Sequence, residues 1–208
     1  MNTLPTERSV LVRVDVQNDF IDGSLAVAEG RQVVTPLNEV ASTVRASGGQ
    51  VVNTRDWHPP VTPHFDTWPV HCVAETEGAE LHPALQVEES DILLSKGMGQ
   101  TDGYSGWEGV SEDGQTLETI IEPKSLYEKV RVLIGGLATD FCVEATALST
   151  AGRFADDDRV EILLLRDAIR AVNLTADAGE RAIKAMEDAG IVAITCAEAR
   201  ALVEESVR

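Results

Sequence analysis

Short apolar runs rich in β-branched residues alternate along the chain with segments whose apolar residues recur at helical spacing. The runs predict six buried strands, at residues 10–16, 50–54, 91–95, 130–134, 160–165 and 191–195. The helical pattern predicts helices over residues 32–46, 143–151 and 176–189, the first of them ended by Gly48 and Gly49. This alternation favours an α/β fold with three α/β/α layers and a mostly parallel central sheet. In such folds ligands bind beyond the carboxyl ends of the strands.

Two long stretches, residues 59–86 and 97–114, lack either pattern. Irregular segments of this length inside a compact domain are usually functional, so we expect them to form the walls of a pocket. No internal repeat, low-complexity tract or linker interrupts the chain. With 208 residues, 43% of them hydrophobic, the chain is predicted to form one domain over residues 1–208.

The charge balance narrows the choice of partners. A formal net charge of -18, from 35 acidic and 17 basic residues, disfavours nucleic acid and anionic membranes and leaves a small molecule as the expected partner. No run approaches the roughly 18 apolar residues of a membrane helix, and residues 1–8 lack the apolar core of a signal peptide. We therefore expect a soluble, cytoplasmic protein.

Cysteine usage points away from disulfides. Cys72, Cys142 and Cys196 are odd in number and widely spaced, which argues against a disulfide framework and leaves room for a working thiol. Cys72 and Cys196 are interpreted as small buried hydrophobic residues.

Asp56 and three of the four histidines fall within sixteen residues. A carboxylate two positions before a histidine points to the same side of an extended chain, so both can approach one ion. Prolines run through the segment, which places the later histidines on stiff loops. This pattern predicts a metal site, although any single histidine is more often a hydrogen-bonded structural residue, and His82 is interpreted as structural. The candidate ligands are Asp56, His58, His64 and His71.

Three other candidates lie where predicted strands end. Cys142 follows a glycine-containing turn and stands near a helix N-terminus, where backbone N–H groups favour a thiolate; the amides of Ala138 and Cys142 are the natural pair to bind an oxyanion. Asp15 ends the first strand and Lys96 follows the third. Each residue also has an ordinary structural interpretation: Cys142 as a packing residue, Asp15 as a turn carboxylate and Lys96 as a solvated residue at a strand end. Together they supply a thiol, a base and a cation.

Five segments resemble, in order and spacing, the nicotinamidases of the isochorismatase-like cysteine hydrolase superfamily, from about residue 10 to about residue 172. They are residues 14–20 (VDVQNDF), 56–58 (DWH), 68–72 (WPVHC), 96–97 (KG) and 135–142 (GGLATDFC). The resemblance implies an isochorismatase-like fold and a triad in which Cys142 is the nucleophile, Asp15 the general base and acid, and Lys96 its electrostatic partner.

The resemblance also implies a metal and a substrate. One divalent ion, with zinc favoured over iron or manganese, is expected on Asp56, His58, His64 and His71, in contact with the ring nitrogen of the substrate. Phe20 and Trp68 are expected to flank a pyridine ring. Tyr104 and Trp107 match the loop after the lysine, either to close the pocket or simply to pack. The peptide bond between Leu137 and Ala138 corresponds to one that is cis in relatives.

The implied reaction is hydrolysis of nicotinamide to nicotinate and ammonia through a thioester, as in NAD salvage. Two alternatives stay open. One is another isochorismatase-like hydrolase acting on a carbamoyl, ureido or isochorismate-type substrate. The other is a catalytically silent binding protein in which the metal only stabilises the structure. Relatives often self-associate, so a homo-oligomer is expected. The turn at Gly23 is one residue shorter than in many relatives, which leaves substrate selectivity open.

Overall fold

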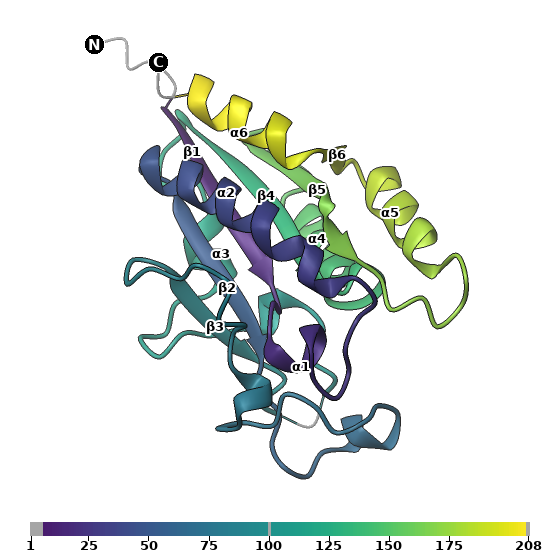
Figure 1. The fold of residues 1–208 in the computed structure, drawn as a ribbon. Helices are drawn as coiled ribbons and strands as arrows, with labels where there is room; N and C mark the ends of the chain where they lie inside the picture. The colour runs from purple at the N-terminus through teal and green to yellow at the C-terminus, as the bar shows by residue number, and fades with distance from the viewer. Residues whose placement is uncertain (1–5, 100, 207–208) are drawn as a thin grey trace.

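Six parallel strands form one sheet, in the order β3-β2-β1-β4-β5-β6 (Figure 1). The structure is a computed structural model that describes residues 6–99 and 101–206. The strands are β1 (Thr6–Val14), β2 (Gln50–Asp56), β3 (Ile92–Lys96), β4 (Glu128–Leu137), β5 (Val160–Arg170) and β6 (Val192–Ile194). The predicted parallel α/β sheet is confirmed.

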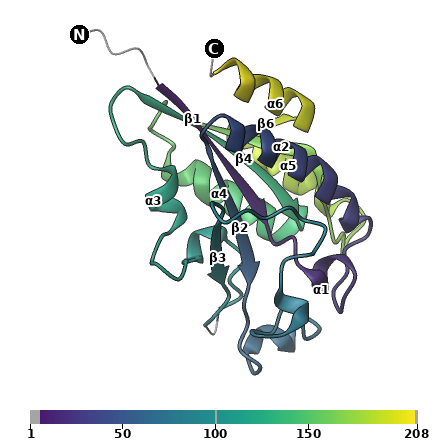
Figure 2. The same cartoon turned by 60° about the vertical axis from the view of Figure 1, so that its left-hand side comes forward.

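Alternating side chains of the strands face two separate apolar layers. On β1, Leu11 faces one layer, while Val10 and Val12 face the other. Helices α2 (Val34–Ala46) and α6 (Cys196–Glu205) cover the first face. The second face is covered by α3 (Leu117–Ile121), α4 (Glu144–Arg153) and α5 (Ala178–Asp188) (Figures 1 and 2). Both faces of the sheet are therefore buried, as three-layer folds require.

The observed elements differ from the predicted ones mainly at their ends. Strands β4 and β5 run beyond the predicted ranges 130–134 and 160–165, and β1 ends at Val14, so Asp15 follows it. Lys96 is the last residue of β3 rather than the first residue after it. A π-helical turn, Thr139–Val143, precedes α4 where a simple helix start was expected. Helix α1 (Asn18–Ile21) and α3 were not predicted because four or five residues are too few to show a period.

Helix α6 was also missed, although the sequence carries its start signal. Thr195 and Glu198 form a capping box, in which each side chain accepts a hydrogen bond from the backbone N–H of the other residue. The helix buries only the small residues Cys196, Ala199 and Val203 against α2 and the sheet. Such a weakly apolar stripe gives little periodic signal. Within the described residues, none of the helices is long and apolar enough to cross a membrane.

The carboxyl ends of neighbouring strands bring distant residues to one edge of the sheet. Asp15 follows β1, Asp56 ends β2 and Lys96 ends β3, and these three strands lie side by side. The long connections after β2 and β3 extend beyond this edge (Figure 1). The topology thus places the candidate residues where ligands bind in α/β folds.

Gly136 allows β1 and β4 to approach closely next to this edge. Its φ is +130°, and a Cβ atom built there would lie 2.0 Å from the carbonyl oxygen of Val14. Real Cβ atoms do not come so close to a backbone oxygen, so a side chain would force the two strands apart. The strain would fall directly beside Asp15 and Ala138.

We predict that Gly136→Ala lowers the free energy of unfolding by at least about 2 kcal/mol, because it adds both a clash and an unfavourable φ. Urea denaturation measures the change. Gly152→Ala is the matched control: its Cβ would meet open space within α4, so it should stabilise the fold by about 0.5–1 kcal/mol. Equal stabilities of the two variants would contradict this account of the strand contact.

Candidate active site

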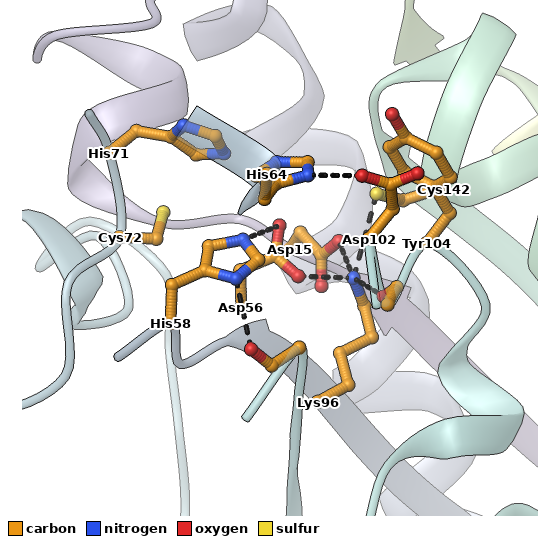
Figure 3. Close-up of polar contacts among 12 residues, drawn as sticks. Asp15, Asp56, His58, His64, His71, Cys72, Lys96, Asp102, Tyr104 and Cys142 are labelled. Atoms are coloured by element: carbon orange, nitrogen blue, oxygen red, sulfur yellow. Dashed lines mark hydrogen bonds and ion pairs between the residues drawn. The ribbon is translucent and has the colours of Figure 1, made fainter. Parts of the chain in front are cut away.

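The Lys96 ammonium lies at the centre of a fully buried polar cluster (Figure 3). Its Nζ is 2.8 Å from Oδ2 of Asp15 and 2.6 Å from Oδ1 of Asp56. It also donates a hydrogen bond of 2.9 Å to the carbonyl of Gly103 and lies 3.5 Å from Sγ of Cys142. The structure therefore brings Asp15, Lys96 and Cys142 together, as the sequence motifs led us to expect.

The two carboxylates beside Lys96 differ in how readily they bind a proton. Burial alone raises the pKa of Asp56, but the Lys96 ammonium and the nearby His58 ring outweigh it and hold the pKa at about 2. Burial raises the pKa of Asp15 above the ordinary aspartate value, even though Lys96 and Thr54 favour its ionised form. Of the two carboxylates, Asp15 is thus the better proton acceptor.

Lys96 itself keeps its charge. Burial disfavours the ammonium, but the attraction of Asp15, Asp56 and Cys142 outweighs this penalty and raises the pKa of Lys96 well above its ordinary value. A charged lysine is consequently a fixed feature of the cluster at neutral pH. Its positive charge offsets part of the repulsion between the two aspartates.

The thiol of Cys142 is buried and holds its proton at rest. Cys142 is 6% exposed and lies in the π-helical turn between β4 and α4. Burial raises the pKa of its thiol well above the ordinary value, with Lys96 opposing this effect and Asp15 adding to it. A carboxylate oxygen of Asp15 lies within 4.8 Å of the sulfur. The thiol therefore needs the base that the structure places beside it.

The other two cysteines do not join the site. Cys72 and Cys196 are buried, and burial raises the pKa of each thiol. The peptide N–H of Cys72 donates to Asp19, and that of Cys196 donates to Asp167. These contacts fit the structural interpretation of both residues.

Two residues that the sequence analysis missed fix the aspartates. The Thr54 hydroxyl donates a hydrogen bond of 2.6 Å to Oδ1 of Asp15. The side-chain amide of Gln17 donates a hydrogen bond to the backbone carbonyl of Asp56 and accepts one from the backbone N–H of Asp56, each at 2.8 Å. Thr54 lies near the end of β2, next to β1, so the strand order could have indicated it once the pairing was known.

The three imidazoles of the predicted metal site converge. One ring nitrogen from each of His58, His64 and His71 lies within 4.8 Å of the others. Each Nδ1 has its own acceptor: the Gly97 carbonyl at 3.0 Å, a carboxylate oxygen of Asp102 at 2.7 Å and the Pro69 carbonyl at 2.7 Å, respectively. A carbonyl can only accept a hydrogen bond, so Nδ1 of His58 and of His71 must carry the proton.

These hydrogen bonds leave the Nε2 lone pairs free to bind a cation. Nε2 of His58 is buried and has no hydrogen-bond partner among the residues that the structure describes. Burial lowers the pKa of His71, which favours the neutral ring. Neutral imidazoles oriented through Nδ1 by carbonyl and carboxylate acceptors are the usual surroundings of a metal, so these residues fit a divalent ion.

Asp56 joins the imidazole group to the lysine cluster. Its Oδ2 lies 3.7 Å from Nε2 of His58, while its Oδ1 contacts Lys96 (Figure 3). All four predicted ligands thus lie in one region, with Asp56 shared between the two groups. His82 is not part of this group. Its ring contacts Asp22 and accepts a hydrogen bond from the backbone N–H of Ala84.

A small apolar pocket opens onto both groups. Its walls include the three predicted substrate-binding residues Phe20, Trp68 and Tyr104, and its floor includes Cys142 and Ala138. The indole N–H of Trp68 donates a 2.9 Å hydrogen bond to the hydroxyl of Tyr104. The peptide bond that joins Leu137 to Ala138 is cis.

Further wall residues were not predicted from the sequence. Phe141 packs edge-on against Trp68, with ring centroids 4.9 Å apart, and Leu25 and Val172 complete the apolar lining. Leu25 follows the short turn at Gly23. Trp107, for which the sequence allowed either pocket closure or packing, packs against α4, and its indole N–H donates a hydrogen bond to Thr150.

Three successive residues of the loop after β3 each contact a different part of the site. Asp102 accepts a hydrogen bond from His64, the Gly103 carbonyl accepts one from Lys96, and the Tyr104 hydroxyl accepts one from Trp68. The loop therefore connects the imidazoles, the lysine and the pocket wall. The expectation that residues 97–114 contribute to a pocket is confirmed for Tyr104.

Comparison with known proteins gives a consistent assignment. Residues 9–198 match the isochorismatase domain family. A nicotinamidase/pyrazinamidase of Mycobacterium tuberculosis is 38% identical over 145 residues, which cover 66% of this chain and 75% of that protein.

Solved structures agree with this result. The pyrazinamidase of Pyrococcus horikoshii in complex with zinc is 34% identical, with a TM-score of 0.77 over 90% of this chain and 99% of that one. PnC1 from L. infantum in complex with nicotinate is 31% identical, with a TM-score of 0.76 over 94% of this chain and 96% of that one.

We predict that Asp15→Asn shifts the pH profile of Cys142 alkylation to lower pH. The Asp15 carboxylate raises the pKa of the thiol, so its loss leaves the effect of Lys96 less opposed. Iodoacetamide labelling followed by mass spectrometry measures the profile. Asp113→Asn, which changes an exposed carboxylate bonded to Ser111 and Gln115, should leave it unchanged. A shift to higher pH in Asp15→Asn would be incompatible with the electrostatics described for the thiol.

Proposed function

The chain belongs to the isochorismatase family, and from this premise and the geometry of the pocket we propose that it is a nicotinamidase, which hydrolyses nicotinamide to nicotinate and ammonia. One observation carries the proposal: a single apolar pocket is lined by Cys142 and by the imidazoles of His64 and His71. Nicotinamide offers a carboxamide to a thiol and a ring nitrogen to a metal site on one small flat molecule. The neighbouring structure solved with nicotinate supports this choice.

The pocket walls favour an aromatic amide over the alternatives. Phe20, Trp68 and Tyr104 would flank the pyridine ring, with Phe141 closing the same wall. A small linear carbamoyl or ureido substrate would leave these aromatic surfaces uncovered. The lysine cluster supports catalysis over a purely structural role, because a packing site does not need a thiol beside a buried base.

We propose that His58, His64, His71 and Asp56 hold one divalent ion. When bound, the ion would supply a Lewis-acidic contact for the ring nitrogen and so orient the substrate. Zinc, iron and manganese all suit a set of imidazoles and one carboxylate. The zinc in the Pyrococcus horikoshii neighbour supports zinc.

In the first half of the reaction, Asp15 accepts the proton of Cys142 and the sulfur attacks the amide carbon. The negative oxygen that forms is bound by the backbone N–H groups of Ala138 and Cys142. Asp15 then passes the proton to the amide nitrogen, the carbon–nitrogen bond breaks, and ammonia leaves a thioester on Cys142.

In the second half, Asp15 accepts a proton from a water molecule, whose oxygen attacks the thioester carbon. The carbon–sulfur bond breaks, and the sulfur recovers the proton from Asp15. Lys96 stays charged throughout, which stabilises the thiolate and keeps Asp15 ionised before each attack. Thr54 holds the Asp15 carboxylate in place through its hydroxyl.

The proposed reaction belongs to NAD salvage, which accords with the cytoplasmic location expected from the sequence. A single domain over residues 1–208 and self-association of the protein also stay predictions.

We predict that Cys142→Ala reduces ammonia release from nicotinamide by about 10³-fold or more, because no other group can form the thioester. A coupled ammonia assay measures the rate. Cys196→Ala, which changes a buried cysteine outside the pocket, should keep the rate within about threefold. Undiminished turnover by Cys142→Ala would discard the covalent route. Faster turnover of a ureido compound than of nicotinamide by the unchanged protein would discard the nicotinamidase assignment.

We predict that Asp102→Asn weakens zinc binding by about ten- to hundredfold, because Asp102 orients His64 and raises its basicity as a ligand. Competition with a chromophoric chelator measures the affinity. Glu108→Gln is the matched control, since this exposed carboxylate of the same loop contacts Thr101 and no imidazole. Equal zinc affinities in the two variants would remove Asp102 from the account of the metal site.

A further inference from the structure

Two groups of potential metal ligands lie side by side next to the pocket. The first is the imidazole group, His58, His64 and His71. The second is formed by Asp15, Asp56 and Cys142, whose oxygen and sulfur atoms also lie within 4.8 Å of one another. All six residues are buried. The groups are adjacent, because Oδ2 of Asp56 lies 3.7 Å from Nε2 of His58 (Figure 3).

The second group is chemically a good site for the same cations as the first. Thiolate is a strong ligand for zinc, and two carboxylates add charge that the neutral imidazoles lack. An ion bound there would occupy the sulfur lone pair and prevent attack on a substrate. A protein that keeps a metal next to a nucleophilic thiol therefore needs a means of keeping the two apart.

Lys96 occupies the position that such an ion would take. Its Nζ contacts Asp15 at 2.8 Å, Asp56 at 2.6 Å and the sulfur of Cys142 at 3.5 Å, so one cation already faces every ligand of the second group. The contact with the Gly103 carbonyl fixes the ammonium from a fourth direction. By contrast, each imidazole directs its Nδ1 to Gly97, Asp102 or Pro69, and none of these hydrogen bonds involves Lys96.

We propose that the Lys96 ammonium serves as a built-in cation that excludes a divalent metal from the Cys142 thiolate and confines the metal to the imidazole group. This inference rests on the proposed function, in which Cys142 is the nucleophile beside a metal. It adds a second role for Lys96: electrostatic repulsion and occupied space protect the sulfur from the ion that orients the substrate.

Cobalt is the probe that tests this proposal. Co²⁺ bound by a thiolate shows sulfur-to-metal charge-transfer absorption in the near ultraviolet, whereas Co²⁺ bound by imidazole and carboxylate lacks this band. The unchanged protein, titrated with Co²⁺ alone, should bind one equivalent without the band. Lys96→Ala should acquire the band, and the double variant Lys96→Ala/Cys142→Ser should lose it again.

Lys184→Ala is the matched control, because it removes one positive charge at an exposed pair with Asp188 and should give the spectrum of the unchanged protein. Circular dichroism checks that each variant is folded, and Lys96→Ser serves as a second neutral variant. A charge-transfer band in the unchanged protein, or a folded neutral variant without the band, would overturn the proposal. If neither neutral variant folds, the spectrum of the unchanged protein decides.

The readout separates this inference from the proposed function. Absence of ammonia release from nicotinamide, with the expected cobalt spectra, would refute the nicotinamidase assignment and leave the role of Lys96 intact. Normal ammonia release with a thiolate band in the unchanged protein would refute only the role of Lys96.

Discussion

The contact of one buried ammonium with two carboxylates and a thiol determines the rest of the site. Lys96 and Asp15 are fully buried and Asp56 nearly so, and a charge in such a place is tolerated only when it is paired and hydrogen-bonded. Removal of the ammonium would leave two aspartates facing each other without water. Burial keeps the pKa of Asp15 raised against the pull of the ammonium, whereas the ammonium together with His58 lowers that of Asp56, so Asp56 stays ionised while Asp15 can exchange a proton.

The topology of the parallel sheet brings these groups together. Asp15 follows β1, Asp56 and Lys96 end the neighbouring strands β2 and β3, and Cys142 lies in the turn after β4, so residues far apart in the sequence meet at one edge. The close approach of β1 and β4 at Gly136 fixes the spacing next to Asp15. Loops after β2 and β3 then add the imidazoles and two aromatic wall residues, Trp68 and Tyr104. The chemistry is thereby divided between strands, which hold the charged cluster rigidly, and loops, which shape the pocket.

Much of this arrangement could be predicted from the sequence. Apolar runs located all six strands to within a few residues, because strands buried on both faces must be continuously apolar. The position of Asp15 and Lys96 at strand ends indicated their proximity before any coordinates were known. Proline-rich spacing indicated that the histidines sit on loops. The motifs then linked these residues to the cysteine.

Other features depend on contacts that periodicity does not encode. Thr54 and Gln17 act through side-chain hydrogen bonds that exist only once β1 and β2 are aligned. Asp102 reaches His64 because of the path of a loop, and Phe141 enters the pocket because a π-helical turn redirects it. Such contacts follow from tertiary register and loop geometry, which local sequence patterns leave undetermined.

The central claim is that one small aromatic amide meets the thiol and the metal at the same time. A crystal structure of Cys142→Ala with zinc and nicotinamide tests it most directly. The account predicts one ion on Asp56, His58, His64 and His71, the ring nitrogen facing that ion, and the carboxamide carbon facing residue 142. Zinc bound elsewhere, or a carboxamide directed away from residue 142, would contradict it.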